Sequence, residues 1–309
     1  MSFAEFMRLA LYDPHVGYYR ANRTRVGYGH GTDFFTATTS GPIFGALVTA
    51  ACANLLHGQD LSQYSFVEIG AETAGTIIDG AHHPYRISRS IRNGEPLTLD
   101  GRCIVFSNEL FDAQPFRRFV FLNGAWREVG VALRDGFLAE IVYSNDADGV
   151  PDGVLPLTAQ EGYVFDAPLA AVALLDSILT QPWNGLFVAC DYGKSWRELA
   201  EACPAGTARA YYRHSQSNEL LARPGEQDLT CHVCWDWLSE SLSKHGFAAS
   251  NLMSQESFWV HHSAEYIENI SVSEAGRFSH KKQSLQQLLH PAHLGQKFQV
   301  LWGKRAALG

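Results

Sequence analysis

The sequence has no block of lysine and arginine, few charged residues and no long apolar run. Charged residues make up 18% of the 309 residues, and the net charge is −8. Nucleic acids and anionic membranes attract proteins through clustered positive charge, so neither partner is expected. The N-terminus lacks a signal-peptide pattern, and no apolar run approaches the roughly 20 residues of a membrane span. We therefore expect a soluble, cytoplasmic protein whose mild acidity weakly favours a basic protein segment as its partner.

A disulfide framework and a zinc finger are also missing. The cysteines are scattered, and several stand in apolar, strand-like runs, as reduced, buried cysteines do. Two of them flank His232 with the spacing of zinc ligands, but no second Cys/His pair follows at finger spacing, so no metal site is expected. The six cysteines are Cys52, Cys103, Cys190, Cys203, Cys231 and Cys234.

The chain does contain enough apolar residues, 46%, to bury a large core. Short apolar runs typical of buried strands alternate with stretches of helical periodicity. This alternation, which ends in a strand pair, predicts a doubly wound α/β sheet. Strands are expected at residues 65–69, 103–106, 185–190, 247–252 and 298–302, and helices at residues 2–13, 40–51, 168–179, 231–246 and 281–289.

The N-terminal helix carries its own start and stop signals. Ser2 and Glu5 have the pattern of a capping box, and Pro14 ends the helix. Residues 13–37 are rich in glycine and aromatic side chains and include Asp33. Such an arm could cover a pocket as a lid, or it could serve packing alone, which is the simpler interpretation of this segment by itself.

A glycine-containing turn follows the first strand. Gly70 and Gly75 precede a helix-like apolar run, and a strand, a glycine turn and a helix together are typical of nucleotide-cofactor sites. Glu72 stands where a further glycine is expected, and a tight turn without a ligand explains the pattern equally well. Residues 79–102 contain no apolar strand that ends in an acid for ribose hydroxyls, and Glu95 is the nearest substitute.

The strand at residues 103–106 ends in three polar residues, Ser107, Asn108 and Glu109. In open α/β sheets, ligands bind at the carboxyl ends of the strands. Glu109 and Asp112, three residues apart, can point their carboxylates the same way and hold or deprotonate a cationic nucleophile. A helix cap with a solvated turn is the simpler alternative.

The strand at residues 185–190 repeats this pattern. It ends in Asp191 and Tyr192, so a second acid follows a second apolar strand. Two strands whose carboxyl ends each carry an acid make a functional site more credible than either does alone.

An insertion is expected around residues 116–145. The sequence there alternates in polarity around Asn123-Gly124 and Asp135-Gly136, which are strong hairpin signals. We expect a three-stranded antiparallel meander that decorates the main sheet.

An ordered set of short motifs runs along nearly the whole chain. It consists of Leu11-Tyr12-Asp13-Pro14, Gly17-Tyr18-Tyr19, Thr32 to Ala37, Phe44-Gly45, Val67 to Gly70, Ser107 to Ala113, Asp191-Tyr192-Gly193, Gly206 to Tyr212, His214, Pro224-Gly225, Asp228-Leu229-Thr230, His232-Val233, Leu289-His290-Pro291, Gly295 and Phe298. Taken in this order, the motifs resemble the MidA-like S-adenosylmethionine-dependent methyltransferases. That family contains the mitochondrial complex I assembly factor that methylates arginine.

The resemblance implies a class I methyltransferase-like α/β fold. The fold would be a doubly wound seven-stranded sheet with an N-terminal helical arm and the inserted meander. Residues 1–60 would form the arm and lid, and residues 61–309 the α/β domain. The cofactor would be S-adenosyl-L-methionine, and the family's activity is symmetric dimethylation of a protein arginine. The expected partner is therefore a protein with an accessible arginine, and the terminal strands or the meander could form a homodimer.

The resemblance also implies roles for individual residues. A guanidinium is always protonated and delocalised, so carboxylates that localise its charge and orient it would do most of the catalysis. The catalytic candidates are Glu109, Asp112, Asn108 and Asp33; the cofactor-binding candidates are Glu68, Gly70, Gly75, Asn108, Tyr19 and Thr36; and the candidates on the substrate side are Asp191, Tyr192, His214 and Asp228.

Two other functions stay open. Residues 71–74 interrupt the family's closely spaced glycines, and the segment expected to hold the ribose is short. A degenerate member could keep the fold and act as a binding or assembly module without transferring methyl groups. A small-molecule methyltransferase is the third alternative.

Overall fold

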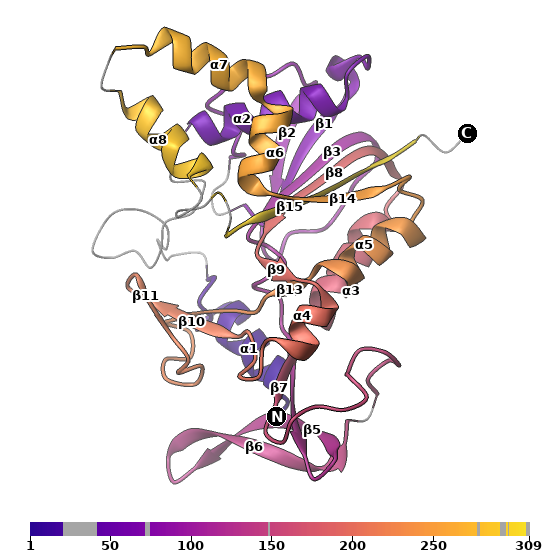
Figure 1. The fold of residues 1–309 in the computed structure, drawn as a ribbon, viewed down its shortest axis with the longest axis vertical. Coiled ribbons are helices and arrows are strands. Elements are labelled where there is room, and N and C mark those ends of the chain that lie inside the picture. The colour runs from indigo at the N-terminus through magenta and orange to yellow at the C-terminus, as the bar shows by residue number, and fades with distance from the viewer. Residues whose placement is uncertain are drawn as a thin grey trace. The chain divides into compact units, whose positions relative to one another are not determined.

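The computed structural model describes residues 1–20, 42–71, 75–147, 149–276, 279–290, 295 and 297–306 (Figure 1). Contacts within the chain define two compact units. The arm unit consists of Met1–Phe34, Phe111–Leu175 and Gly193–Leu238, and the sheet unit consists of Phe35–Leu110, Asp176–Tyr192 and Ser239–Gly309. The boundary expected at residue 60, between an arm and an α/β domain, stays a prediction.

The sheet unit is built on a six-stranded sheet, as far as its residues are described. Its strands, in spatial order, are β14 (Ser250–Ser254), β15 (Gln299–Arg305), β8 (Trp183–Asp191), β3 (Gly101–Asn108), β1 (Ser65–Ile69) and β2 (Ile87–Ile91). The four strands from β8 to β2 are parallel to one another. Strand β15 is antiparallel to β8, and β14 is antiparallel to β15. The predicted α/β sheet with a terminal strand pair is therefore confirmed, whereas a seventh strand stays a prediction.

Two expectations for the segment after β1 were wrong. The described residues after Gly75 form turns up to residue 86 where a helix was predicted, and β2 follows where no strand was predicted. In β2, an outer strand paired on one side with β1, Ile91 alone is buried. A strand that buries one residue has no continuous apolar run, which is why the sequence did not reveal it.

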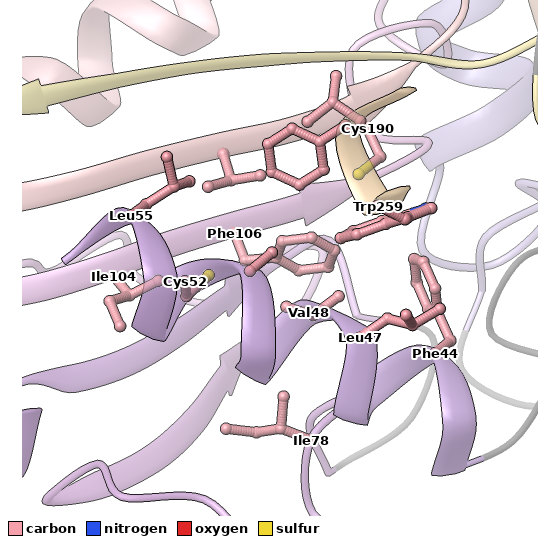
Figure 2. Close-up of a cluster of buried hydrophobic side chains, with 14 of the residues drawn as sticks. Phe44, Leu47, Val48, Cys52, Leu55, Ile78, Ile104, Phe106, Cys190 and Trp259 are labelled. Carbon is pink, nitrogen blue, oxygen red and sulfur yellow. The ribbon is translucent and has the colours of Figure 1, made fainter. Parts of the chain in front are cut away.

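Helices cover the sheet and enclose a large core in the sheet unit. They are α2 (Pro42–Leu55), α6 (Gln255–His262), α7 (Ala264–Ser273) and α8 (His280–Leu289). Side chains of α2, among them Phe44 and Val48, lie beside Phe106 of β3 and Trp259 of α6 (Figure 2). The predicted apolar face of α2 is buried, because β3 carries apolar residues toward it. No helix in the described ranges is both long and apolar enough to span a membrane.

The arm unit contains the predicted insertion. Its four-stranded sheet has the order β6 (Phe137–Asp146), β5 (Ala125–Arg134), β4 (Arg117–Leu122) and β7 (Val164–Ala167). The meander β4–β5–β6 is confirmed, with Asn123 and Asp135 in left-handed backbone conformation at its two turns. The fourth strand, β7, was not predicted, and it pairs antiparallel with β4.

Helix α1 (Phe3–Tyr12) starts at the predicted cap. The Ser2 side chain accepts a hydrogen bond from the Glu5 N–H at 3.1 Å, and Phe3, Phe6 and other apolar residues of α1 are buried. The Glu5 carboxylate pairs with Arg8, one turn along the helix, at 2.7 Å. The predicted helix is therefore confirmed, but only the serine half of the capping box is present.

The remaining elements are two longer helices, α3 and α5, and several short segments. They are η2 (Leu61–Gln63), α3 (Leu169–Leu179), β9 (Gly193–Lys194), α4 (Trp196–Glu201), β10 (Arg209–Tyr212), β11 (Ser215–Ser217), β12 (Asp228–Thr230), β13 (Val233–Cys234) and α5 (Trp235–Lys244). Strands β11, β10 and β12 form a small antiparallel sheet in the arm unit. It carries two of the predicted substrate-side residues, Asp228 on β12 and His214 in the turn after β10.

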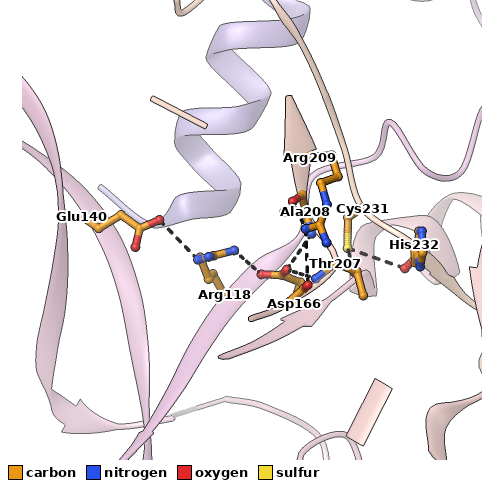
Figure 3. Close-up of polar contacts among 9 residues, drawn as sticks. Arg118, Glu140, Asp166, Thr207, Ala208, Arg209, Cys231 and His232 are labelled. Carbon is orange, nitrogen blue, oxygen red and sulfur yellow. Dashed lines mark hydrogen bonds and ion pairs between the residues drawn. The ribbon is translucent and has the colours of Figure 1, made fainter. Parts of the chain in front are cut away.

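A buried ion pair ties β4 to β7 in the arm unit (Figure 3). Asp166, on β7, accepts a hydrogen bond from Arg118 Nη1 at 2.7 Å through Oδ1. Its Oδ2 accepts the backbone N–H groups of Thr207 and Ala208 at 2.7 and 2.9 Å. Glu140 lies 3.3 Å from Arg118 Nε, without the geometry of a hydrogen bond. Asp166 thus uses both carboxylate oxygens to join two strands and the segment that enters β10.

All six cysteines, each within the described residues, are free thiols. Five are buried, and Cys203 is half-buried. Burial raises the pKa of Cys52 and of Cys234 to about 12. The predicted absence of a disulfide framework among these cysteines therefore agrees with their positions.

Candidate functional site

The carboxyl end of β3 has an unusual backbone. Glu109 follows Asn108, the last residue of β3, and has a φ of +52°, in the left-handed region. Its N–H donates a hydrogen bond to the carbonyl of Cys190 on β8 at 2.9 Å. Left-handed backbone outside glycine costs of order 1 kcal/mol, and such residues cluster at functional sites. Glu109 is thus a strained residue fixed between two strand ends.

The Glu109 carboxylate is held at both oxygens. Asn108 Nδ2 donates a hydrogen bond to Oε1 at 3.0 Å, and the Tyr192 hydroxyl donates to Oε2 at 3.2 Å. Tyr192 follows β8, where its N–H donates to Oδ1 of the fully buried Asp191 at 2.9 Å. The structure therefore brings four predicted residues together at the carboxyl ends of β3 and β8. Their roles in catalysis stay predictions.

The left-handed backbone at Glu109 gives a stability prediction. Both Glu109→Ala and Glu109→Gly remove the carboxylate, but alanine keeps the strain and glycine releases it. We expect the glycine variant to be more stable by about 1 kcal/mol in urea unfolding. At Glu268, exposed in helix α7, the same two substitutions should rank in the opposite order, because glycine is the poorer helix former. A glycine variant at position 109 that is no more stable than the alanine variant would contradict the strain.

The predicted cofactor-binding acid, Glu68, lies on β1 and contacts the turn that follows this strand. Glu68 is buried, and its Oε2 accepts the N–H of Ile77 at 2.6 Å. Burial raises the pKa of Glu68 to about 7; the hydrogen bond from Ile77 opposes this shift, and Asp79 adds to it. Glu68 therefore fastens the end of the turn to β1 with a carboxyl group that titrates near neutrality.

The contribution of Glu68 to stability should consequently fall between about pH 4.5 and pH 7. The folded state holds the Glu68 proton more tightly than the unfolded state, so this contribution is full below pH 4.5 and is lost as pH rises through 7. Relative to wild type, Glu68→Gln should gain about 3 kcal/mol of unfolding free energy from pH 4.5 to pH 8. Urea unfolding across this range measures the difference. The control is Glu240→Gln, an exposed ion-pair residue of α5. A pH-independent difference for Glu68→Gln would contradict the prediction.

The two predicted glycines of the turn lie against side chains. Gly70 has a φ of +83°, and a Cβ there would lie 2.8 Å from Leu110 Cδ1. At Gly75 a Cβ would lie 2.7 Å from Asp79 Oδ2. Gly70 is therefore required both by its backbone conformation and by the approach of Leu110. Glu72 lies outside the described residues.

The arm unit holds a second group of predicted residues. The Tyr19 hydroxyl donates to Oδ1 of the buried Asp228 at 3.0 Å, and the Tyr12 ring stacks on Tyr19 with centroids 5.4 Å apart. Asp112 is also buried, and its carbonyl accepts the N–H of Cys231 at 2.9 Å. Asp112 falls in the arm unit and Glu109 in the sheet unit, so the expectation that their carboxylates point the same way stays a prediction.

The remaining predicted residues are placed as follows. His214 has a φ of +62° and is exposed in the hairpin turn between β10 and β11. Asp33 and Thr36 lie outside the described residues. His232, beside Cys231 and Cys234, is half-buried, and desolvation lowers its pKa to about 4. Within the described ranges, no three His, Cys, Asp or Glu side chains are grouped to hold a metal ion.

Two features at this edge of the sheet unit were not predicted from the sequence: a ring contact and a pair of buried polar atoms without a partner. The Tyr192 ring packs on Phe298, with centroids 4.6 Å apart. Asn108 Oδ1 is buried and has no hydrogen-bond partner in the structure, and the buried Ser107 Oγ has none either, as judged over the described chain. A buried polar atom without a partner is costly, so these atoms suit a ligand that brings hydrogen-bonding groups to the strand end.

Comparison with known proteins supplies the family. A family described as "Putative S-adenosyl-L-methionine-dependent methyltransferase" matches residues 82–253, more than half of the chain. No curated protein sequence matches significantly. A Burkholderia thailandensis crystal structure bound to S-adenosyl-homocysteine is 24% identical, with a TM-score of 0.84 over 100% of this chain and 89% of that one. A native structure of an uncharacterized protein of the same superfamily and organism is 23% identical, with a TM-score of 0.78 over 100% of this chain and 88% of that one.

These two likenesses establish a methyltransferase-like α/β fold, and the family match establishes the cofactor class. The unpartnered Asn108 Oδ1 and the tight, left-handed Gly70 fit that cofactor class. The chain belongs to the family of S-adenosyl-L-methionine-dependent methyltransferases.

Proposed function

We propose that this protein transfers a methyl group from S-adenosyl-L-methionine to an arginine side chain of a protein. The observation that carries the proposal is the Glu109 carboxylate, held at both oxygens on a strained backbone at the carboxyl end of β3. A guanidinium stays protonated and spreads its charge over three nitrogens. A fixed carboxylate draws that charge toward the nitrogens it binds and leaves another nitrogen as the nucleophile.

The residues around the β1 turn and the β3 end would hold the cofactor. Gly70 would let the backbone approach it, Asn108 would accept a hydrogen bond through its buried Oδ1, and Glu68 would keep the turn fastened to β1. Bound there, S-adenosyl-L-methionine supplies an electrophilic methyl group on a sulfonium. The chain itself contributes position and charge, which can account for most of the acceleration in such a transfer.

Glu109 would also dispose of the proton. When the nitrogen gains a methyl group, it must lose one proton to keep the guanidinium singly charged. Glu109 would accept that proton or pass it to solvent. Asp191, a buried acid of the same unit that the resemblance assigns to the substrate side, is the next candidate for binding the cation.

One observation favours a binding or assembly module instead. In the described residues, β1 is followed by turns rather than by the helix whose N-terminus usually presents N–H groups to a nucleotide cofactor. Calorimetric titration with S-adenosyl-L-methionine separates the two functions. Saturable binding supports the enzyme, whereas the absence of binding heat at millimolar cofactor supports the binding or assembly module.

The acceptor is tested with radiolabelled cofactor. The purified protein is incubated with tritiated S-adenosyl-L-methionine and undermethylated cell protein, which is then hydrolysed and separated by amino-acid chromatography. Label that co-migrates with ω-methylated arginine supports the proposal. Label in another amino acid, or only in small molecules, contradicts the arginine acceptor while leaving the methyltransferase intact.

A further inference from the structure

We propose that Tyr192 is a positioning residue that fixes the Glu109 carboxylate, and that Phe298 in turn fixes Tyr192. The catalytic part of this inference rests on the proposed function, whereas the clamp itself is a property of the sheet unit. All three residues belong to that unit.

The backbone at Tyr192 is fixed from two sides. Its N–H donates to Asp191 Oδ1 at 2.9 Å, and Asp191, the last residue of β8, is opposite Gln299 of β15 in the antiparallel register. Phe298, just before β15, is buried, and its carbonyl accepts the N–H of Gln255 at 2.9 Å. The end of β8 and the start of β15 are therefore held by strand pairing and by the first residue of helix α6.

The Tyr192 ring has a correspondingly fixed place. It packs on the Phe298 ring with centroids 4.6 Å apart and planes tilted by 52°. A phenol has few rotatable bonds, so a ring held on one face directs its hydroxyl along a single line. Here the hydroxyl reaches Glu109 Oε2 at 3.2 Å.

Asn108 alone cannot fix the carboxylate in this way. It is the sequence neighbour of Glu109, and it donates to Oε1 only. A donor on each carboxylate oxygen fixes the plane of the group, and the Tyr192 hydroxyl supplies the donor on Oε2. Because Tyr192 reaches across from the end of β8, it also fixes the carboxylate relative to a second strand. A planar, oriented carboxylate is what a planar guanidinium requires.

A double-mutant cycle tests the clamp without any methyl transfer. Urea unfolding is measured for wild type, Tyr192→Phe, Glu109→Ala and the double variant. If the hydroxyl acts through Glu109, Tyr192→Phe lowers the folded-to-unfolded ratio about tenfold when Glu109 is present and less than about twofold when it is alanine. Equal losses in both backgrounds would mean that the hydroxyl serves the fold alone, and that result overturns the proposal. Tyr266→Phe, on helix α7 of the same unit, is the control and should not depend on Glu109.

Methyl-transfer kinetics test the catalytic part. With tritiated S-adenosyl-L-methionine and undermethylated cell protein as substrates, Tyr192→Phe should lower kcat about tenfold and leave the KM for S-adenosyl-L-methionine within about twofold. Phe298→Ala should lower kcat in the same direction, and Phe298→Tyr, which keeps the ring, should restore it. Coupling in unfolding with an unchanged kcat overturns the catalytic part of the inference. Absence of transfer by the wild-type protein contradicts the proposed function instead, and the unfolding cycle still decides the clamp.

Discussion

Glu109→Gln is expected to lower methyl transfer at least about a hundredfold while cofactor affinity changes less than about twofold. The amide has the size of the carboxylate and can still accept a hydrogen bond from Asn108 or Tyr192. It carries no negative charge, so it can neither localise the charge of a guanidinium nor accept a proton. The substitution therefore lowers the rate of methyl transfer and leaves the affinity for the cofactor nearly unchanged.

Two measurements on the same preparation check this result. Single-turnover transfer of the tritiated methyl group gives the chemical step, and calorimetric titration gives cofactor affinity. Glu5→Gln removes an exposed carboxylate of α1 and should leave both values at the wild-type level. Retained turnover in Glu109→Gln would place the catalytic charge elsewhere, with the buried Asp191 as the next position to test.

Asp166→Ala is expected to lower the free energy of unfolding by about 3–5 kcal/mol. The substitution removes the β7 partner of the Arg118 guanidinium, whose side chain is 12% exposed, and leaves it the more exposed Glu140; it also removes the acceptor of two backbone N–H groups. A buried charge or polar group left unpaired is among the most destabilising consequences of a single substitution. The substitution should destabilise the whole arm unit, because Asp166 joins β4, β7 and the segment entering β10.

Asp166→Asn separates the two contributions. Asparagine keeps one acceptor oxygen but loses the charge, so the free energy of unfolding of Asp166→Asn should lie between the values for wild type and Asp166→Ala. The control is Glu5→Ala, which breaks an exposed ion pair within α1 and should leave the free energy of unfolding close to that of wild type. Urea unfolding of the four proteins at neutral pH gives the comparison, and a loss below about 1 kcal/mol for Asp166→Ala would contradict the role assigned to the pair.

The fold was predictable wherever local sequence and burial agreed. The helix at Ser2, the buried strand β1 and the hairpins at Asn123 and Asp135 each combine a clear start or turn signal with an apolar pattern. Strand β2 buries only Ile91, and β7 has only four residues, so neither has a periodic signal. Helix α6 was not predicted, because one of its three buried residues, Gln255, is polar, and the two apolar ones, Phe258 and Trp259, are too few to give a helical pattern.

The acidic residues of the site could be predicted from the sequence, whereas the contacts between its side chains could not. Glu109 could be found because a polar residue at the carboxyl end of a buried parallel strand is a general place for a ligand. Its left-handed backbone could not be found, since no glycine or asparagine marks the position. The contact between Tyr192 and Phe298 joins residues 106 positions apart, and only the pairing of β8 with β15 brings them together.

The distribution of the cysteines makes the protein convenient for spectroscopy. Five of the six thiols are buried, and burial raises the pKa of Cys52 and Cys234 to about 12, so few of their thiolates are available at neutral pH. Cys203, two residues after α4, is half-buried, and burial raises the pKa of its thiol as well, but it is the most accessible of the six thiols to a maleimide fluorophore. The wild-type chain therefore offers one thiol in the arm unit that can be labelled without engineered cysteines.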